Sequence, residues 1–172
     1  MKEIIYNYDN LNNDEIDEIV VRTKGLIINC KDEIMLGYSD KTYQFPGGHL
    51  EENETLLECL KREIREETGI ELKDYNLKPF VKITHLTKNY RKTGKNRKNE
   101  IYYYIIKTDK LYDKNNTNLD EGEIKGNYKI VSIPLKNVEK VLLESIQDNP
   151  INKIIVKEML NILKEYNKIK VK

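Results

Sequence analysis

Residues 48–70 read GHLEENETLLECLKREIREETGI, and this stretch carries most of the structural and chemical information in the sequence. Thr55, followed three residues later by Glu58, forms a capping-box pattern that typically begins a helix. Gly69 can adopt the left-handed conformation in which many helices end. The pattern therefore predicts a helix over residues 56–68.

The side chains of this predicted helix divide into an apolar face and an acidic face. The apolar positions share the spacing of a core-facing stripe: Leu57, Leu60 and Ile64. At ~100° per residue, Glu63, Glu66 and Glu67 gather on the adjoining face. We expect these three glutamates to lie where the apolar stripe borders on solvent.

Three carboxylates within one helical turn repel one another, and a requirement for stability alone would scatter them. A bound cation would remove this repulsion, and carboxylate oxygens are the hard ligands that Mg²⁺ and Mn²⁺ prefer. Because the chain has only His49 and His85 as histidines, a zinc site of the usual nitrogen and sulfur type is not indicated. The alternative is a solvated acidic helix with ordinary ion pairs.

The segment before the helix, Phe45-Pro46-Gly47-Gly48, ends a strand predicted over residues 41–45. Two consecutive glycines leave the backbone open to close approach by a metal ion or a phosphate. Taken alone, Pro-Gly-Gly indicates only a turn. Its position directly before the acidic helix is what gives it functional weight.

The spacing of residues 48–70 matches the Nudix box without a gap: Gly48, five residues, Glu54, seven residues, and then Arg-Glu-Ile-Arg-Glu-Glu-Thr-Gly-Ile. The chain therefore resembles the Nudix hydrolases. The resemblance implies an α/β (α+β) fold, a mixed β-sheet sandwiched between α-helices, as a single domain over residues 1–172. It is strong over residues 43–70, and elsewhere it rests on the order of the elements.

The resemblance implies metal-dependent hydrolysis of a nucleoside diphosphate linked to another group, with Mg²⁺ or Mn²⁺ as the cofactor. Glu66 and Glu67 would be the principal metal ligands, and Glu63 a ligand or the general base. The carbonyl of the residue that matches Gly47 commonly joins the metal shell. Glu54 would be a further metal contact.

Two more positions complete the implied site. Arg62 would pair with a neighbouring carboxylate and fix its direction, so it is counted with the catalytic residues. In several relatives an acid beyond the box acts as a ligand or base, and here Asp120, Glu121 and Glu123 are candidates. We favour Glu123 because it shortly precedes a predicted strand, although a polar loop explains each of the three equally well.

A basic segment could bear on the substrate. Residues 82–99 contain seven lysines and arginines and no acid, and residues 89–99 are expected to form an exposed loop between two strands. Arg91, Lys92 and Lys95 would hold a polyphosphate there, and Tyr90 could stack on a base. The alternative is a solvated hairpin without a binding role.

The remaining pattern predicts a sheet with helices on its sides. Strands are expected over residues 3–8, 20–29, 33–38, 77–86, 100–106 and 128–133. The tyrosines at 102–104 are expected to be half-buried strand residues. Asn149 and Pro150 predict the start of a helix that runs to about residue 166. Its buried stripe would consist of Ile151, Ile154, Ile155, Met159, Ile162 and Leu163.

Composition indicates a small cytoplasmic enzyme. The chain has 172 residues, 38% of them hydrophobic, which suits one domain. Its 30 basic and 29 acidic residues nearly cancel, so general attraction to nucleic acid or to a membrane is not indicated. Two cysteines form no disulfide framework, and no apolar leader or membrane span is expected. A monomer and a homodimer both remain open.

Three functional hypotheses follow. The leading one is a hydrolase that converts a canonical or oxidised nucleoside triphosphate to the monophosphate and pyrophosphate. The second keeps this chemistry but acts on RNA 5′ ends, dinucleoside polyphosphates or nucleotide sugars, with RNA not favoured. The third is a non-catalytic nucleotide sensor. Base recognition cannot be transferred from relatives that use an arginine before the box, because residues 30–50 contain none.

Overall fold

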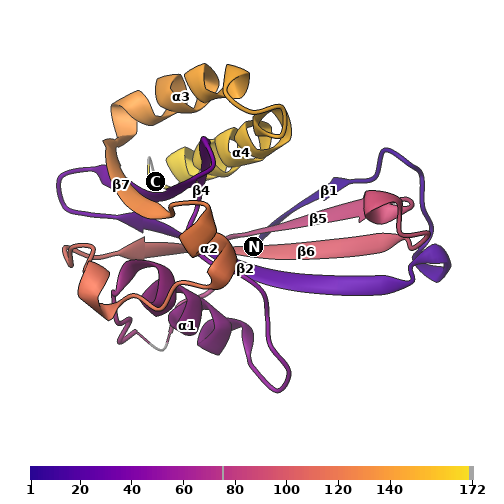
Figure 1. The fold of residues 1–172 in the computed structure, drawn as a ribbon, viewed down its shortest axis with the longest axis horizontal. Helices are drawn as coiled ribbons and strands as arrows, with labels where there is room; N and C mark the ends of the chain where they lie inside the picture. The colour runs from indigo at the N-terminus through magenta and orange to yellow at the C-terminus, as the bar shows by residue number, and fades with distance from the viewer. Residues whose placement is uncertain (75, 171–172) are drawn as a thin grey trace.

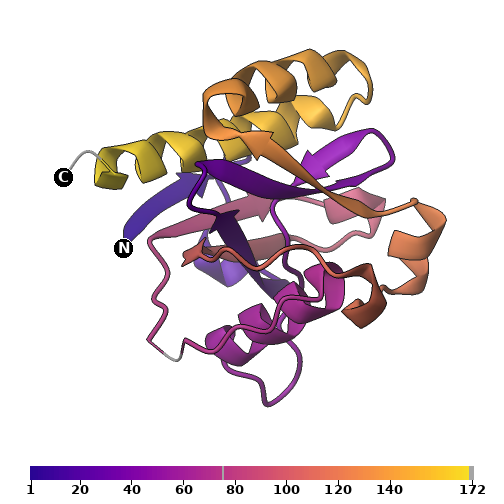
Figure 2. The ribbon, with the colours of Figure 1, turned by 90° about the vertical axis from the view of Figure 1, so that its left-hand side faces the viewer.

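The computed structural model describes residues 1–74 and 76–170 of the chain (Figure 1). Over these residues the fold is a seven-stranded mixed sheet with helices on both faces, which confirms the predicted fold class. Figure 2 shows the sheet in the middle layer, with α3 and α4 on one side and α1 on the other. None of the helices in the described residues is long and apolar enough to cross a membrane.

The strands are β1 (Lys2–Tyr6), β2 (Glu18–Ile28), β3 (Glu33–Ser39), β4 (Thr42–Gln44), β5 (Val81–Thr87), β6 (Arg97–Lys107) and β7 (Lys129–Pro134). The α-helices are α1 (Leu56–Thr68), α2 (Glu121–Lys125), α3 (Leu135–Glu144) and α4 (Asn152–Lys170). The strand order is β1-β5-β6-β2-β3-β4, with β7 paired to β3. The β1–β5 and β2–β6 pairs are parallel, and the other pairs are antiparallel.

Two apolar cores lie on opposite faces of the sheet because successive strand residues point to opposite sides. On β2, Leu26 and Ile28 pack in the core beneath α3 and α4, whereas Ile27 packs in the core beneath α1. The side chains of the tyrosines at 102–104 on β6 also alternate between the two faces of the sheet. Tyr103 belongs to the first core and Tyr104 to the second, so their strand assignment is confirmed, although both rings are almost fully buried.

Helix α1 forms as its local signals predict. The Thr55 hydroxyl accepts a hydrogen bond from the backbone N–H of Glu58 at 3.3 Å, and the Glu58 carboxylate accepts one from the backbone N–H of Thr55 at 2.8 Å. Gly69 ends the helix with φ of 71°, and its N–H donates to the carbonyl of Arg65. The predicted bounds of residues 56–68 are confirmed.

The buried stripe predicted for the last helix is wrong at its start. Ile151 and Ile154 are 52% and 66% exposed, and the stripe instead runs through Asn152, Val156, Met159, Ile162, Leu163 and Tyr166. The cause is the buried side chain of Asn152, which accepts from the Thr42 hydroxyl and donates to the carbonyls of Lys41 and Ser145. These hydrogen bonds set the rotation of α4 about its axis.

The glycine that ends α1 allows the effect of a steric contact on stability to be separated from the effect of backbone strain. A Cβ atom at Gly69 would lie 2.2 Å from the carbonyl oxygen of Asp113 in a left-handed conformation. We expect Gly69→Ala to lower the free energy of unfolding by about 3 kcal/mol, which combines strain and overpacking. Urea denaturation measures this change.

Gly94→Ala is the matched control, because Gly94 also has a positive φ, of 82°, but a Cβ atom there would meet nothing within 4 Å. This variant should lose only about 1 kcal/mol from backbone strain. Equal losses in the two variants would show that the contact with Asp113 has no energetic weight.

Candidate active site

The loop between β4 and α1 is held flat against strand β2. The backbone N–H of Gly25 donates to the carbonyl of Pro46 at 2.8 Å, and the N–H of Thr23 donates to the carbonyl of Gly48 at 3.0 Å. These bonds continue the sheet pattern into the loop. They place the two glycines directly beside the acidic face of α1.

Lys24 supports the same loop from beneath. Its side chain is half-buried, and its Nζ atom donates to the carbonyl of Phe45 at 2.9 Å and lies 3.4 Å from the carbonyl oxygen of Gly47. Burial lowers the pKa of Lys24, and the negative charge of Glu67 opposes this shift. The lysine therefore brings a positive charge to the inner side of the loop, a position that sequence reasoning did not single out.

Glu67 is the most deeply buried of the box glutamates, with 4% of its surface exposed. Its carboxylate accepts hydrogen bonds from the backbone N–H of Gly47 at 3.1 Å and from the hydroxyl of Tyr128 at 2.5 Å. Burial raises the pKa of Glu67 to about 8, although the charge of Lys24 acts in the opposite direction. The expectation that Glu67 lies at the border with solvent is wrong, because the loop and Tyr128 cover it.

Tyr128 was not recognised as a site residue from the sequence. It directly precedes β7, and its ring lies against Gly37 on β3, where a Cβ atom would be 2.3 Å from the tyrosine hydroxyl. A glycine within a strand pattern signals close approach by another group. Gly37 was therefore the available signal, but only the strand pairing shows which group approaches it.

Arg62 organises the more exposed carboxylates. Its Nε and Nη2 atoms donate to the two oxygens of Glu54 at 2.9 and 3.0 Å, and its Nη1 atom donates to Glu63 at 2.8 Å and to Glu66 at 3.1 Å. Nη2 also donates to the carbonyl of His49 at 2.9 Å. The sequence predicted one carboxylate partner for Arg62, whereas in the structure it is hydrogen-bonded to three and lies 3.7 Å from a fourth, that of Glu51.

Glu63 lies against the second glycine of the loop. A Cβ atom at Gly48 would be 2.4 Å from both carboxylate oxygens of Glu63, so a larger residue there would displace the carboxylate. Burial raises the pKa of Glu63, and the hydrogen bond from Arg62 acts in the opposite direction. The loop therefore limits where this carboxylate can sit.

Helix α2, which was not predicted, brings an acid from beyond the box to the site. Asp120 caps this helix by accepting from the N–H of Glu123 at 2.7 Å, and Glu121 is exposed beside Lys125. Burial raises the pKa of Glu123, and its charge in turn raises the pKa of Glu67. Of the three candidate acids, Glu123 is the one that the structure places beside the box carboxylates.

The donor chemistry fits a hard divalent cation. Within residues 1–74 and 76–170, no three His, Cys, Asp or Glu side chains are already arranged as a metal site. The groups that meet here are nevertheless carboxylate and carbonyl oxygens, the ligands that Mg²⁺ and Mn²⁺ prefer. The raised pKa values of Glu63, Glu67 and Glu123 show that their ionised forms are disfavoured, and a bound cation would favour those forms.

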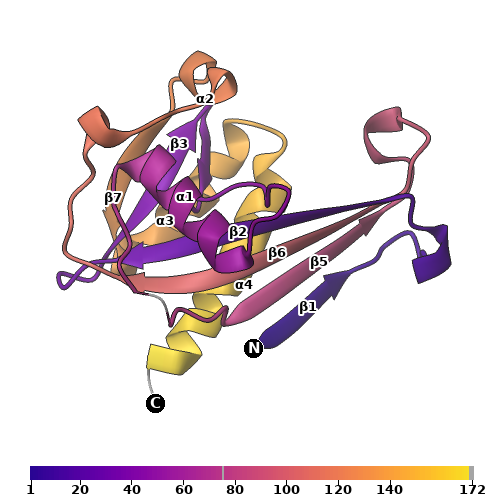
Figure 3. The ribbon, with the colours of Figure 1, turned by 90° about the horizontal axis from the view of Figure 1, so that it is seen from below.

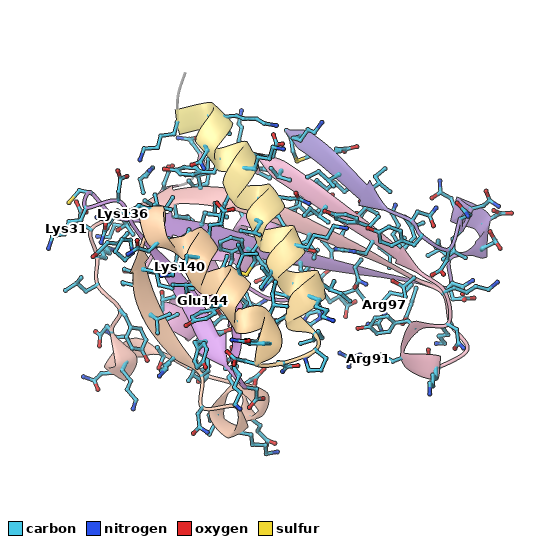
Figure 4. The ribbon with its side chains drawn as sticks, turned by 90° about the horizontal axis from the view of Figure 1, so that it is seen from above. Lys31, Arg91, Arg97, Lys136, Lys140 and Glu144 are labelled. Atoms are coloured by element: carbon cyan, nitrogen blue, oxygen red, sulfur yellow. The ribbon has the colours of Figure 1, made fainter. Side chains whose placement is uncertain are left out.

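The basic loop lies away from these carboxylates. It contains a 3₁₀ turn, η2 (Tyr90–Lys92), at the tip of the β5–β6 hairpin, and Figure 3 shows this tip projecting away from α1. Arg91 and Arg97 approach the Tyr90 ring at 5.3 and 3.8 Å from its centroid (Figure 4), whereas Lys92 and Lys95 are exposed. The structure thus separates Arg91, Lys92 and Lys95 from the acidic cluster, while Tyr90 lines a pocket that reaches Lys24.

The family model of the NUDIX domain matches residues 19–149. This chain therefore belongs to the Nudix hydrolase family. A comparison with curated protein sequences gives no match.

Solved structures support the fold. A MutT structure from work on Aliivibrio salmonicida and Vibrio cholerae shares 16% identity at a TM-score of 0.51, and the match covers 80% of this chain and 96% of that one. A C. elegans Ap4A hydrolase shares 16% identity at a TM-score of 0.53, and the match covers 88% of this chain and 98% of that one. A binary complex of a C. elegans Ap4A hydrolase shares 14% identity at 0.55, with the same coverage. At these identities the likeness concerns the fold alone.

Replacing Arg62 tests whether carboxylate repulsion is a dominant constraint. Arg62→Met keeps much of the side-chain length but leaves Glu54, Glu63 and Glu66 without their shared counter-charge. Because the group is partly exposed, we expect a loss of about 2 kcal/mol in the free energy of unfolding without metal. Addition of Mn²⁺ should recover part of this loss. Thermal denaturation with and without Mn²⁺ provides the measurement.

The control is Arg65→Met on the same helix, where the side chain is exposed. This change should cost less than about 0.5 kcal/mol and show no added response to Mn²⁺. If the two variants lost the same stability, the role assigned to Arg62 would be wrong.

The raised pKa of Glu67 leads us to expect that the stability of the metal-free protein depends on pH. Its pKa rises from 4.5 to about 8 on folding, so the folded state binds this proton more tightly. The resulting stabilisation is complete below the unfolded-state pKa and is lost as the pH rises toward 8. Urea denaturation should show a fall of more than ~1 kcal/mol across this range. Glu67→Gln should flatten the profile, and an unchanged slope would refute the assignment.

Proposed function

We propose that this protein is a hydrolase dependent on Mg²⁺ or Mn²⁺ that cleaves the diphosphate linkage of a nucleoside diphosphate derivative. The leading substrate is a nucleoside triphosphate, converted to the monophosphate and pyrophosphate. One observation carries the proposal: the box glutamates converge around Arg62 and the glycine loop, with Glu123 brought beside them from α2.

The metal would be held by Glu66 and Glu67 together with the carbonyl of Gly47, Glu63 would be either a ligand or the general base, and Glu54 and Glu123 would be further contacts. When bound, the cation would neutralise charge on the diphosphate and lower the pKa of the attacking water. The donor set supports this assignment because it consists of oxygen ligands alone.

The protein's own groups would orient these ligands. Tyr128 and the N–H of Gly47 hold one oxygen of Glu67, and Lys24 holds the loop that presents the Gly47 carbonyl. Arg62 directs Glu63 and Glu66. Glu63 is suited to accept the water proton, because its raised pKa lies closer to neutrality than that of an ordinary carboxylate.

A dinucleoside polyphosphate is the second candidate substrate. The observation that favours it is the basic hairpin tip, where Arg91 is exposed and Arg97, which is paired with Glu18, lies over the ring of Tyr90, a residue that lines the pocket. Such a tip suits further phosphates or a second base, and two of the fold neighbours are described as Ap4A hydrolases. RNA 5′ ends and nucleotide sugars share this chemistry and remain alternatives.

A substrate panel with Mg²⁺ or Mn²⁺ tests the proposal. It should contain nucleoside triphosphates, dinucleoside polyphosphates, nucleotide sugars and 5′-triphosphorylated RNA, with products identified by chromatography. We expect Glu63→Gln, Glu66→Gln and Glu67→Gln each to lower kcat at least about 100-fold on the preferred substrate, because each removes a charged group from the reacting centre. The change keeps the size of the side chain, so circular dichroism should remain unchanged.

The matched control is Glu52→Gln, an exposed glutamate within the same box. It should retain full activity. A nucleotide sensor would give a different result: the wild-type protein would bind one member of the panel tightly and release no product from any of them.

A further inference from the structure

Glu67 is held through one of its two carboxylate oxygens. The backbone N–H of Gly47 and the hydroxyl of Tyr128 both donate to Oε2, at 3.1 and 2.5 Å. A carboxylate with one oxygen fixed in this way presents its other oxygen in a defined direction, and such outer partners orient the ligands of many metal sites. The two donors therefore fix Oε2 and leave Oε1 for a further ligand.

Tyr128 reaches this carboxylate through space that exists because residue 37 is a glycine. A Cβ atom at Gly37 on β3 would lie 2.3 Å from the tyrosine hydroxyl oxygen and 2.6 Å from two atoms of the ring. Gly37 does not have a positive φ, so conformational freedom does not explain this glycine. A glycine inside a strand is otherwise unfavourable for the sheet. The absence of a side chain at residue 37 therefore determines where the Tyr128 hydroxyl can lie.

The backbone of Tyr128 is tied to the helix that carries Glu123. Its N–H donates to the carbonyl of Glu123 at 2.9 Å, and its side chain is only 7% exposed. The charge of Glu123 also acts on Glu67, whose pKa it raises. One buried tyrosine thus joins α2, strand β3 and the last glutamate of the box. The direction of the Glu67 carboxylate depends on all three elements.

A second tyrosine in the chain makes the same kind of bond away from the box. The hydroxyl of Tyr103 on β6 donates to the carboxylate of Glu158 on α4, and Tyr103 is 1% exposed. This pair shows what a buried tyrosine–carboxylate bond does for stability alone. It provides a reference against which a role in metal binding can be measured.

We propose that Tyr128 is a positioning residue of the metal site: its hydroxyl holds Oε2 of Glu67 so that Oε1 faces the cation. The space beside Gly37 sets the place of that hydroxyl. The inference rests on the proposed function, because it concerns the same cation. It adds that a residue outside the box determines how tightly the box carboxylates bind the cation.

The test is Tyr128→Phe, which removes the hydroxyl and keeps the ring. Mn²⁺ binding to the substrate-free protein is followed by electron paramagnetic resonance of the free ion. We expect the dissociation constant for Mn²⁺ to rise about 10- to 100-fold, the loss that is typical when the hydrogen-bond partner of a metal ligand is removed. An unchanged dissociation constant would overturn the inference.

Tyr103→Phe is the matched control, because it removes the same group from the pair with Glu158. This variant should have a lower melting temperature than the wild type and an unchanged dissociation constant for Mn²⁺. If Tyr103→Phe weakened Mn²⁺ binding as much as Tyr128→Phe does, the loss would come from a loosened core, and Tyr128 would have no positioning role.

Gly37→Ala perturbs the same hydroxyl from the opposite strand and leaves the tyrosine itself intact. Its Cβ atom would displace the hydroxyl, so this variant should also bind Mn²⁺ more weakly than the wild type. It carries the test if Tyr128→Phe does not fold. Wild-type Mn²⁺ binding in Gly37→Ala would show that the space beside Gly37 does not set the position of the carboxylate.

Glu67→Gln separates this inference from the proposed function. If Glu67→Gln binds Mn²⁺ more weakly than the wild type while Tyr128→Phe binds it equally well, the inference is overturned and the metal-dependent hydrolase stands. If the wild type binds Mn²⁺ no more tightly than Glu67→Gln, the metal assignment of the proposed function fails, and the inference fails with it.

Discussion

Electrostatic repulsion among carboxylates crowded onto one helix is the constraint on which the rest of this site depends. Glu63, Glu66 and Glu67 occupy little more than one turn of α1, and water reaches them only in part. Two positive charges reduce this repulsion: the guanidinium of Arg62 on the outer side and the ammonium of Lys24 on the inner side. The surrounding loop, strand and helix positions follow from the need to hold these groups in place.

Two kinds of carboxylate result from this arrangement. Glu54, Glu63 and Glu66 share one planar cation and stay near the surface, whereas Glu67 is buried under Tyr128 and the glycine loop. Burial raises the pKa of Glu67 and of Glu63, so both groups respond strongly to added positive charge. A site of this kind favours binding of a divalent cation with its anionic substrate, because added positive charge lowers the free energy of keeping the carboxylates ionised.

The pocket beside α4 reaches the loop that borders the acidic cluster. Lys24 forms the boundary between the two regions, because it lines the pocket and also supports the loop carbonyls. The paired Glu158 gives the pocket a polar edge within apolar walls.

The sequence by itself determined α1, its caps, the order of most strands and the identity of the box carboxylates, because these depend on local spacing within a few residues. It did not reveal the burial of Glu67, the contact of Tyr128, helix α2 or the rotation of α4. Those features depend on residues far apart in the chain: Asn152 meets Thr42, and Tyr128 meets both Gly37 and Glu67. Only the pairing of strands and the packing of helices against the sheet decide such contacts, since local spacing carries no information about distant partners.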